Sequence, residues 1–281
     1  MARILTALFA VALFLQPALG AAGDNAADMQ LVQTLMRKSG LDKQLEQIPA
    51  AVQAGIDQAQ QQKGLSSDDM AALKRLSALA FDAKALNDAV RTHVQANLSG
   101  KDIEAALVWL GSPLGERITG LEEAASTPQA VAEMQSMAGR LAGDKARVEK
   151  MKKLDVALQA TESNVRMVLN MQVVITVAMT VSMEPDQQPS VDDILHEVNK
   201  NSAQLRSMLE QQILLSFLYA YRSLTDAELD RYIVFAESAA GKKYQMVTIE
   251  AVSGAMVDAG RKLGSLLGED MKNRKKKSKE A

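Results

Sequence analysis

Apolar positions recur at helical spacing through most of the chain. In residues 27–62, leucine, isoleucine and valine lie mostly three or four positions apart, and Ser39–Gly40 interrupts the pattern once. After Gly64, a serine followed by acidic residues predicts a new helix that begins near residue 67, since the acids suit the first turn. A further helix is predicted over residues 83–97.

The second half of the chain continues the helical pattern. Residues 128–161 are predicted to form one long helical segment, and residues 164–183 are the most apolar part of the chain after its first twenty residues. Arg166, Asn170 and Gln172 fall in the first half of that apolar run, so a buried core helix is favoured over a membrane span.

One clear loop and the absence of strand patterns complete the expected fold. Residues 184–190 have the composition of a loop, and Ser190 can cap a helix that starts at Val191. No alternating pattern with turn residues indicates a strand, and 16 glycines, 6 prolines and 4% aromatic residues favour helices in 281 residues. We therefore predict an all-α helical bundle.

The first 22 residues are typical of a cleavable signal peptide. Arg3 precedes the apolar run 4–15, and small residues follow at Ala18 and Gly20, or at Gly20 and Ala22. The chain has no cysteine, which excludes disulfides, thiol chemistry and lipid attachment at a cleavage-site cysteine. We expect an exported protein of the periplasm, or a secreted one.

Two segments of the chain share one pattern at a distance of 126 residues. Residues 98–126 align without a gap on residues 224–252. The identical pairs are Leu98/Leu224, Val108/Val234, Ser112/Ser238, Gly115/Gly241 and Ala125/Ala251. The alignment predicts an internal duplication that yields two helical units, 23–150 and 151–270, packed into one elongated or pseudo-symmetric body.

Each copy of the pattern predicts a corner between two helices. A hydroxyl residue and an acid three positions later form a capping box, an aromatic residue lies near the helix end, and a serine then caps the next helix. A glycine three positions after that serine indicates that another backbone passes close by. The predicted corner residues are Ser99, Asp102, Trp109, Ser112 and Gly115 in the first copy, and Thr225, Glu228, Phe235, Ser238 and Gly241 in the second.

The serine between glycines in the stretch GSPLG could also suggest a catalytic elbow. That elbow has the order G-x-S-x-G after a strand, whereas Ser112 is the second residue of its stretch. The second copy reads ESAAG and lacks the first glycine, and neither copy has the phosphate-binding pattern. The corner interpretation is favoured.

The repeated unit resembles a bacterial domain-of-unknown-function family, number 2059. The similarity lies in SGKDIEAALVWLGSPLGER and TDAELDRYIVFAESAAGKK, which with their flanks cover about a fifth of the chain. This chain departs from the family pattern by carrying two copies and by having Ala239 where proline is usual. The resemblance implies an exported, all-helical bacterial protein without an established activity, and it provides no catalytic residues.

The histidines and methionines of the sequence do not form the pattern of a catalytic or metal site. His93 and His196 lie in separate segments, and the zinc-protease pattern that begins at His196 has Lys200 in place of the second ligand. The 15 methionines lack histidine or cysteine companions, and they suit an apolar interior or an apolar pocket better than a copper site. We predict no catalytic, cofactor-binding or metal-binding residues.

The C-terminal end is strongly basic, although the whole chain has a net charge of −2. Residues 271–281 are predicted to be a disordered tail. Two interpretations stay open for it, a solvated tail that aids solubility and a tail that contacts anionic lipid, lipopolysaccharide or another envelope protein, but not nucleic acid. The cations are Lys272, Arg274, Lys275, Lys276, Lys277 and Lys279.

These observations lead to two main functions, and an enzyme with a site assembled from distant Asp, Glu, Lys or Ser residues is kept as a third. The first is a non-enzymatic periplasmic or envelope protein that acts as an interaction or structural module. The second is a periplasmic carrier that holds an apolar or lipid-like ligand in a cavity between the two helical units.

Overall fold

The computed structural model of the chain describes residues 22–63, 67–180 and 191–280. Within these ranges every regular element is a helix, which confirms the predicted all-α bundle. The predicted signal peptide, apart from Ala22, and the predicted loop 184–190 lie outside the described residues.

The last of the described helices is the longest, with 42 residues. In chain order the helices are α1 (Ala22–Lys38), α2 (Leu41–Lys63), α3 (Ser67–Ala80), α4 (Ala83–Asn97), α5 (Gly100–Leu110), α6 (Pro113–Ala125), α7 (Pro128–Leu141), α8 (Lys145–Leu158), α9 (Ala160–Thr180), α10 (Val191–Asn199), α11 (Ser202–Ala220), α12 (Asp226–Glu237) and α13 (Ala239–Glu280).

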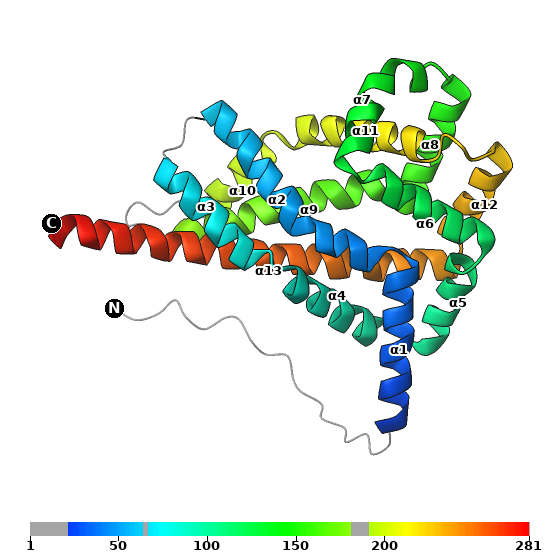
Figure 1. The fold of residues 1–281 in the computed structure, drawn as a ribbon, viewed down its shortest axis with the longest axis horizontal. Helices are drawn as coiled ribbons and strands as arrows, with labels where there is room; N and C mark the ends of the chain where they lie inside the picture. Colours follow the sequence, from blue (N-terminus) through cyan, green and yellow to red (C-terminus); the bar gives the residue numbers. More distant parts are fainter. Residues whose placement is uncertain (1–21, 64–66, 181–190, 281) are drawn as a thin grey trace.

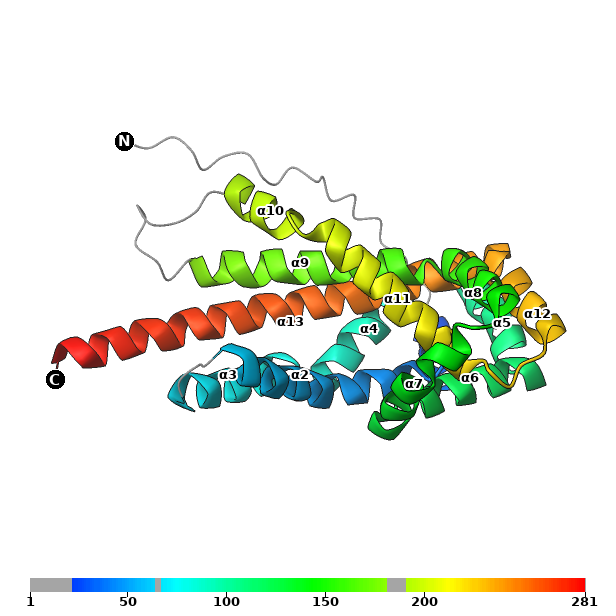
Figure 2. The ribbon, with the colours of Figure 1, turned by 90° about the horizontal axis from the view of Figure 1, so that it is seen from above.

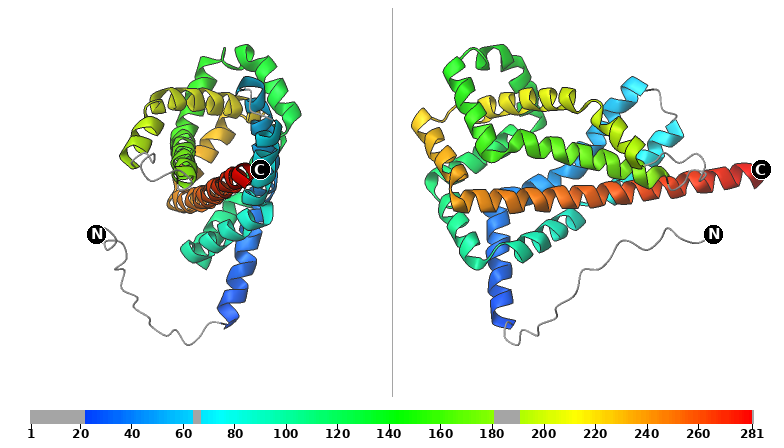
Figure 3. Two further views of the ribbon diagram at one scale, coloured as in Figure 1. Left: turned by 90° about the vertical axis from the view of Figure 1, so that its left-hand side faces the viewer. Right: turned by 180° about the vertical axis from the view of Figure 1, so that it is seen from behind.

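Helix α13 forms the long axis of the fold. It runs beside α9 over much of its length and also contacts α3, α4 and α5 (Figure 1). Helices α10 and α11 lie on one side of the α9–α13 pair, and α2, α3 and α4 lie on the other (Figure 2). The end and back views show the same layered arrangement (Figure 3).

The buried core does not divide at the predicted unit boundary. Residue 150 falls inside α8, and the largest buried cluster combines residues of α1 to α5 with residues of α13. A second cluster joins α6 and α8 to α11 and α12. Segments 23–150 and 151–270 are therefore interleaved rather than separately packed, because each buries its apolar faces against helices of the other.

Local sequence signals determine several helix ends. The break expected at Ser39–Gly40 is confirmed, and Gly40 has a φ of +72°, a left-handed conformation that suits glycine. The segment predicted to be helical over 128–161 is helical but divided, because Asp144 caps a new helix by accepting a hydrogen bond from the Arg147 amide. Gln159 then adopts a left-handed φ of 51° between α8 and α9.

The basic C-terminal segment, which was predicted to be disordered, is helical up to Glu280 in the structure. Arg274 anchors the segment, with Nη1 2.8 Å from Asp69 Oδ1 of α3 and Nε 2.7 Å from Asp270 Oδ2. The segment lacks proline and glycine after residue 268 and is rich in lysine, which favours continuation of the helix.

The apolar run in α9 packs beside α13 and α11. Among the described helices, none has an apolar stretch of the length needed to traverse a lipid bilayer.

Candidate functional site

The first predicted corner joins α5 to α6 through two side-chain caps. Ser99 Oγ accepts a hydrogen bond from the Asp102 amide, and Asp102 Oδ2 accepts one from the Ser99 amide at 2.9 Å. Ser112 Oγ then accepts a hydrogen bond from the Gly115 amide at 3.0 Å and donates one to the Trp109 carbonyl at 2.6 Å. The predicted capping box and helix cap are confirmed.

The second corner repeats this geometry between α12 and α13. Thr225 and Glu228 form the capping box, with the Thr225 amide 2.8 Å from Glu228 Oε2. Ser238 Oγ accepts from the Gly241 amide at 3.0 Å and donates to the Phe235 carbonyl at 2.7 Å. Both serine hydroxyls are therefore engaged by backbone groups of their own corner, as expected for caps.

The repeated glycines let each new helix pass close to the end of the helix before it. A Cβ on Gly115 would overlap the Trp109 carbonyl oxygen and lie 2.9 Å from its carbonyl carbon. A Cβ on Gly241 would overlap the Phe235 carbonyl oxygen in the same way. The expectation that a backbone passes close to these glycines is confirmed, and the backbone belongs to the preceding helix.

The structure brings the two corners into contact with each other. The rings of Trp109 and Phe235, which are equivalent in the alignment, stack with centroids 4.8 Å apart and an interplanar angle of 9°. Because the two stacked residues are equivalent in the alignment, the two corners are related by a local two-fold axis near this ring pair.

Two ion pairs follow the same two-fold relation. Arg117 of the first corner lies 2.6 Å from Glu228, the capping acid of the second corner. Lys243, the equivalent of Arg117, lies 2.7 Å from Asp102, the capping acid of the first corner. Each corner thus supplies a cation to the acid of the other, which is the pattern of a self-complementary interface.

These contacts also act on the capping acids. The hydrogen bond from Lys243, followed by those from Ser99, lowers the pKa of Asp102 to about 2. The hydrogen bond from the Thr225 amide is the main cause that lowers the pKa of Glu228, and the charge of Arg117 adds to it. Both acids are therefore held as carboxylates at neutral pH.

Glu122 has a part-buried carboxyl group that contacts two tyrosines next to the stacked rings. Glu122 Oε1 accepts hydrogen bonds from the hydroxyls of Tyr221 at 2.6 Å and Tyr232 at 3.1 Å. Tyr232 stacks on Trp109 at a centroid distance of 5.9 Å, so the carboxyl group connects α6 to α11 and α12. Burial raises the pKa of Glu122 despite the two hydrogen bonds. No pattern in the sequence marked this group beyond its place in the acidic pair Glu122–Glu123.

An apolar groove of about 600 Å³ opens over the stacked rings, between α5 and α12. Val108 and Val234, another equivalent pair, line it and are 78% and 67% exposed. Single exposed apolar residues are common on protein surfaces, whereas two exposed valines at equivalent positions on one groove form a shared apolar surface. The remaining lining residues are Ala105, Trp109, Ser112, Asp230, Arg231, Phe235, Ser238 and Ala240.

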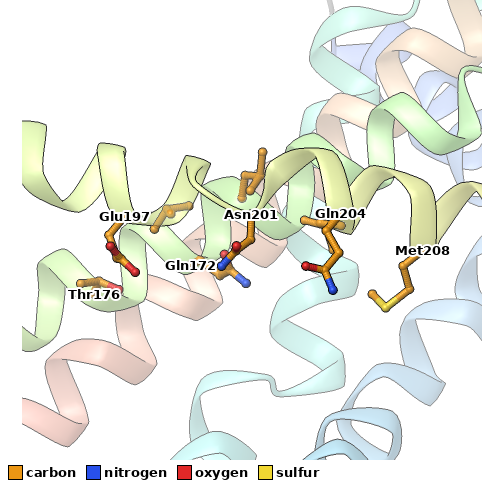
Figure 4. Close-up of a pocket in the computed structure, with 9 residues that line it drawn as sticks. Gln172, Thr176, Glu197, Asn201, Gln204 and Met208 are labelled. Carbon is orange, nitrogen blue, oxygen red and sulfur yellow. The ribbon is translucent and has the colours of Figure 1, made fainter.

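A second, more polar cleft of about 570 Å³ lies between α9 and the junction of α10 and α11. Gln172, Asn201 and Gln204 extend toward it, and Asn201 makes no side-chain cap for α11 (Figure 4). Its open amide groups could hold a polar ligand. The cleft contains none of the predicted corner residues.

The other candidate residues lie apart from the corners. His93 is on α4, with Nε2 3.9 Å from Glu250 Oε2, and His196 is on α10. In the described part of the chain, no three histidine or acidic side chains converge as metal ligands would. The basic end of α13 lies at the opposite end of the molecule from α5 and α12 (Figure 1).

Comparisons of the chain with protein families, with curated proteins and with solved structures found no match.

Proposed function

We propose that the protein is a non-enzymatic, exported protein of the periplasm or cell envelope that works as an interaction module. The paired corners are its binding surface, and the groove between α5 and α12 receives the apolar face of an amphipathic helix from a partner protein. The export signal and the resemblance to family 2059 support the location, and they remain predictions from the sequence.

The observation that carries this proposal is the pair of exposed valines over the stacked rings. Val108 and Val234 are 78% and 67% exposed on a groove of about 600 Å³, whereas most other large apolar residues in the described part of the chain are buried or half-buried. The groove lies on a rigid base, because the ring stack joins α5 to α12 and the two ion pairs join α6 to α12 and α13 to α5. A fixed groove loses little conformational freedom on binding.

A helix is the occupant that the shape of the groove favours. Its walls are two helices of 11 and 12 residues, so the groove matches about three turns of a third helix. Ala105, Ser112, Ser238 and Ala240 are small, and they allow a third helix to approach closely. Asp230 and Arg231 supply both charge signs at the rim, where a polar edge of the partner would lie.

A charge placed in the groove tests the proposal. The tagged protein is purified from its own cell envelope after mild crosslinking, and the partner that is recovered with it is identified. Val108→Asp and Val234→Asp should each abolish recovery of that partner. Val156→Asp is the matched control, because Val156 on α8 is 77% exposed and is not among the groove residues. Equal recovery of the same partner with all three variants would contradict the proposal.

The basic end of α13 is proposed as a separate contact with anionic lipid or lipopolysaccharide. Lys272, Arg274 and Lys276 are exposed on a helix that continues the long axis of the fold. Deletion of residues 272–281 should abolish binding to vesicles that contain anionic lipid at low salt. Binding that survives the deletion would contradict this contact.

A carrier of an apolar or lipid-like ligand is the second candidate function. One observation favours it, namely a cavity of about 310 Å³ between α2, α9 and α13, which belong to the two different predicted units.

A further inference from the structure

The cavity between α2, α9 and α13 combines apolar walls with two buried hydroxyls that lack a hydrogen-bond partner, those of Ser163 and Thr248. Leu41, Met167, Ile249 and Val252 supply apolar lining. Ser163 also lines the cavity, is 9% exposed, and its Oγ is buried without a hydrogen-bond partner. Buried hydroxyls in folded proteins are nearly always hydrogen-bonded, so this atom lacks a partner that a ligand could supply.

Local structure explains why Ser163 is left unpaired. Ser163 lies in the first turn of α9, and this turn follows the left-handed residue Gln159. The backbone amide of Ser163 donates a hydrogen bond to the Gln159 carbonyl. The neighbouring hydroxyl of Thr161 donates to Asp155 Oδ2 at 2.7 Å, whereas Ser163 has no such acceptor. The start of the helix thus holds the Ser163 hydroxyl at the cavity wall.

The lining also defines the charge of a suitable ligand. The described residues that line the cavity include no acid and no base, and the polar ones are Gln44, Ser163, Asn164, Thr248 and Ser253. The side-chain amide of Asn164 already donates a hydrogen bond to the Ala160 carbonyl. A charged head group would lose its hydration in this cavity without gaining a counter-ion.

We propose that this cavity binds a small, neutral amphiphile. A hydroxyl or amide head group hydrogen-bonds to Ser163 Oγ, which can both donate and accept, and a short alkyl chain packs on Met167 and Val252. A volume of about 310 Å³ is at the lower end of the range for ligand pockets, so it suits a short chain. The inference deepens the carrier candidate and does not rest on the groove between the corners, with which the cavity shares no lining residue.

Titration with 1-hexanol, followed by the NMR signal of the Met167 methyl group in the full mature chain, tests the site. We expect a saturable shift with hexanol and a much weaker one with hexanoate, which carries a charge. Ser163→Ala should weaken hexanol binding about threefold to tenfold, the usual effect of one hydrogen bond. Ser136→Ala, at an exposed serine of α7 outside the cavity, should leave the affinity unchanged.

A cavity-filling variant provides a second, independent test. Val252→Trp should abolish the hexanol shift at Met167 while the far-ultraviolet circular dichroism remains helical. The absence of a saturable shift in the wild-type protein would overturn the proposal, and so would equal affinities for the wild type and Ser163→Ala. Neither result would affect partner binding at Val108 and Val234, so failure of this site is distinguishable from failure of the interaction module.

Discussion

Replacement of Gly241 by alanine tests whether the second corner is held by close backbone contact. The added Cβ would overlap the Phe235 carbonyl oxygen and would lie 2.9 Å from the carbonyl carbon and 3.2 Å from the Ala236 Cα. All three atoms belong to the backbone of α12, so no side chain can rotate away to make room. Relief therefore requires that α13 move away from α12, which disturbs the Trp109–Phe235 stack.

The expected magnitude follows from two opposing effects. Extra atoms in a well-packed region typically cost about 1–3 kcal/mol. Replacement of an unconstrained helical glycine by alanine stabilises a protein by about 0.4–1 kcal/mol. Gly254 lies in the same helix, and a Cβ there would meet no atom within 4 Å. We expect Gly241→Ala to lower the free energy of unfolding by about 1–3 kcal/mol and Gly254→Ala to raise it slightly.

Urea unfolding followed by circular dichroism at 222 nm measures both variants against the wild type. The first corner offers the same comparison, because Gly115 contacts the Trp109 carbonyl group, whereas Gly120 in the same helix meets no atom within 4 Å. If Gly241→Ala were as stable as Gly254→Ala, the close approach of the helices would not exist and the corner geometry would be refuted.

Three further predictions concern the groups around the corners. Burial raises the pKa of Glu122, so the contribution of this carboxyl group to stability is complete below its ordinary pKa of 4.5 and is lost as the pH rises through the raised pKa. Glu122→Gln should remove this loss when the free energy of unfolding is measured across pH. The same pH profile for the variant and the wild type would contradict this prediction. The Asp102 carboxyl should titrate in NMR at about 2, and Lys243→Met should raise that pKa toward 3.8, since the hydrogen bond from lysine is the largest cause. Ser238→Ala should cost about 1 kcal/mol of stability in thermal or urea unfolding, whereas Ser238→Asp, which can still cap α13, should retain most of it; equal losses would contradict the capping role.

Features that depend on neighbouring residues could be predicted from the sequence. The helix over residues 83–97 was expected with the bounds that α4 has, and Asp82 caps it by accepting from the Ala85 amide. The capping boxes at Ser99 and Thr225 were predictable for the same reason, because each needs only residues three positions apart. The break at Gly40 is equally local.

Features that depend on distant residues could not be predicted. The alignment matched Arg117 with Lys243 and Asp102 with Glu228, but it could not reveal that each cation bonds the acid of the other corner. Glu122 appeared to be an ordinary surface acid, since the two tyrosines that bury it lie about a hundred positions away.

Two further features also depend on distant residues. Disorder of the basic tail was expected because it has no apolar anchor after Met271, whereas the structure pairs Arg274 with Asp69 of α3, more than two hundred positions away. The division at residue 150 followed from the 126-residue repeat, which cannot reveal that α13 of the second segment packs on α3, α4 and α5 of the first. A repeat in sequence thus does not specify which segments share a core. The internal duplication itself stays a prediction.

The most direct test of the central claim, that the paired corners form one binding surface, is photo-crosslinking from both sides of the groove. A photoreactive amino acid is placed at Val108, at Val234 or at the control position Val156, and the crosslinked peptides are identified by mass spectrometry. We predict that positions 108 and 234 capture the same amphipathic segment of one partner and that position 156 does not. Capture of unrelated peptides at 108 and 234, or the same yield at all three positions, would contradict the claim.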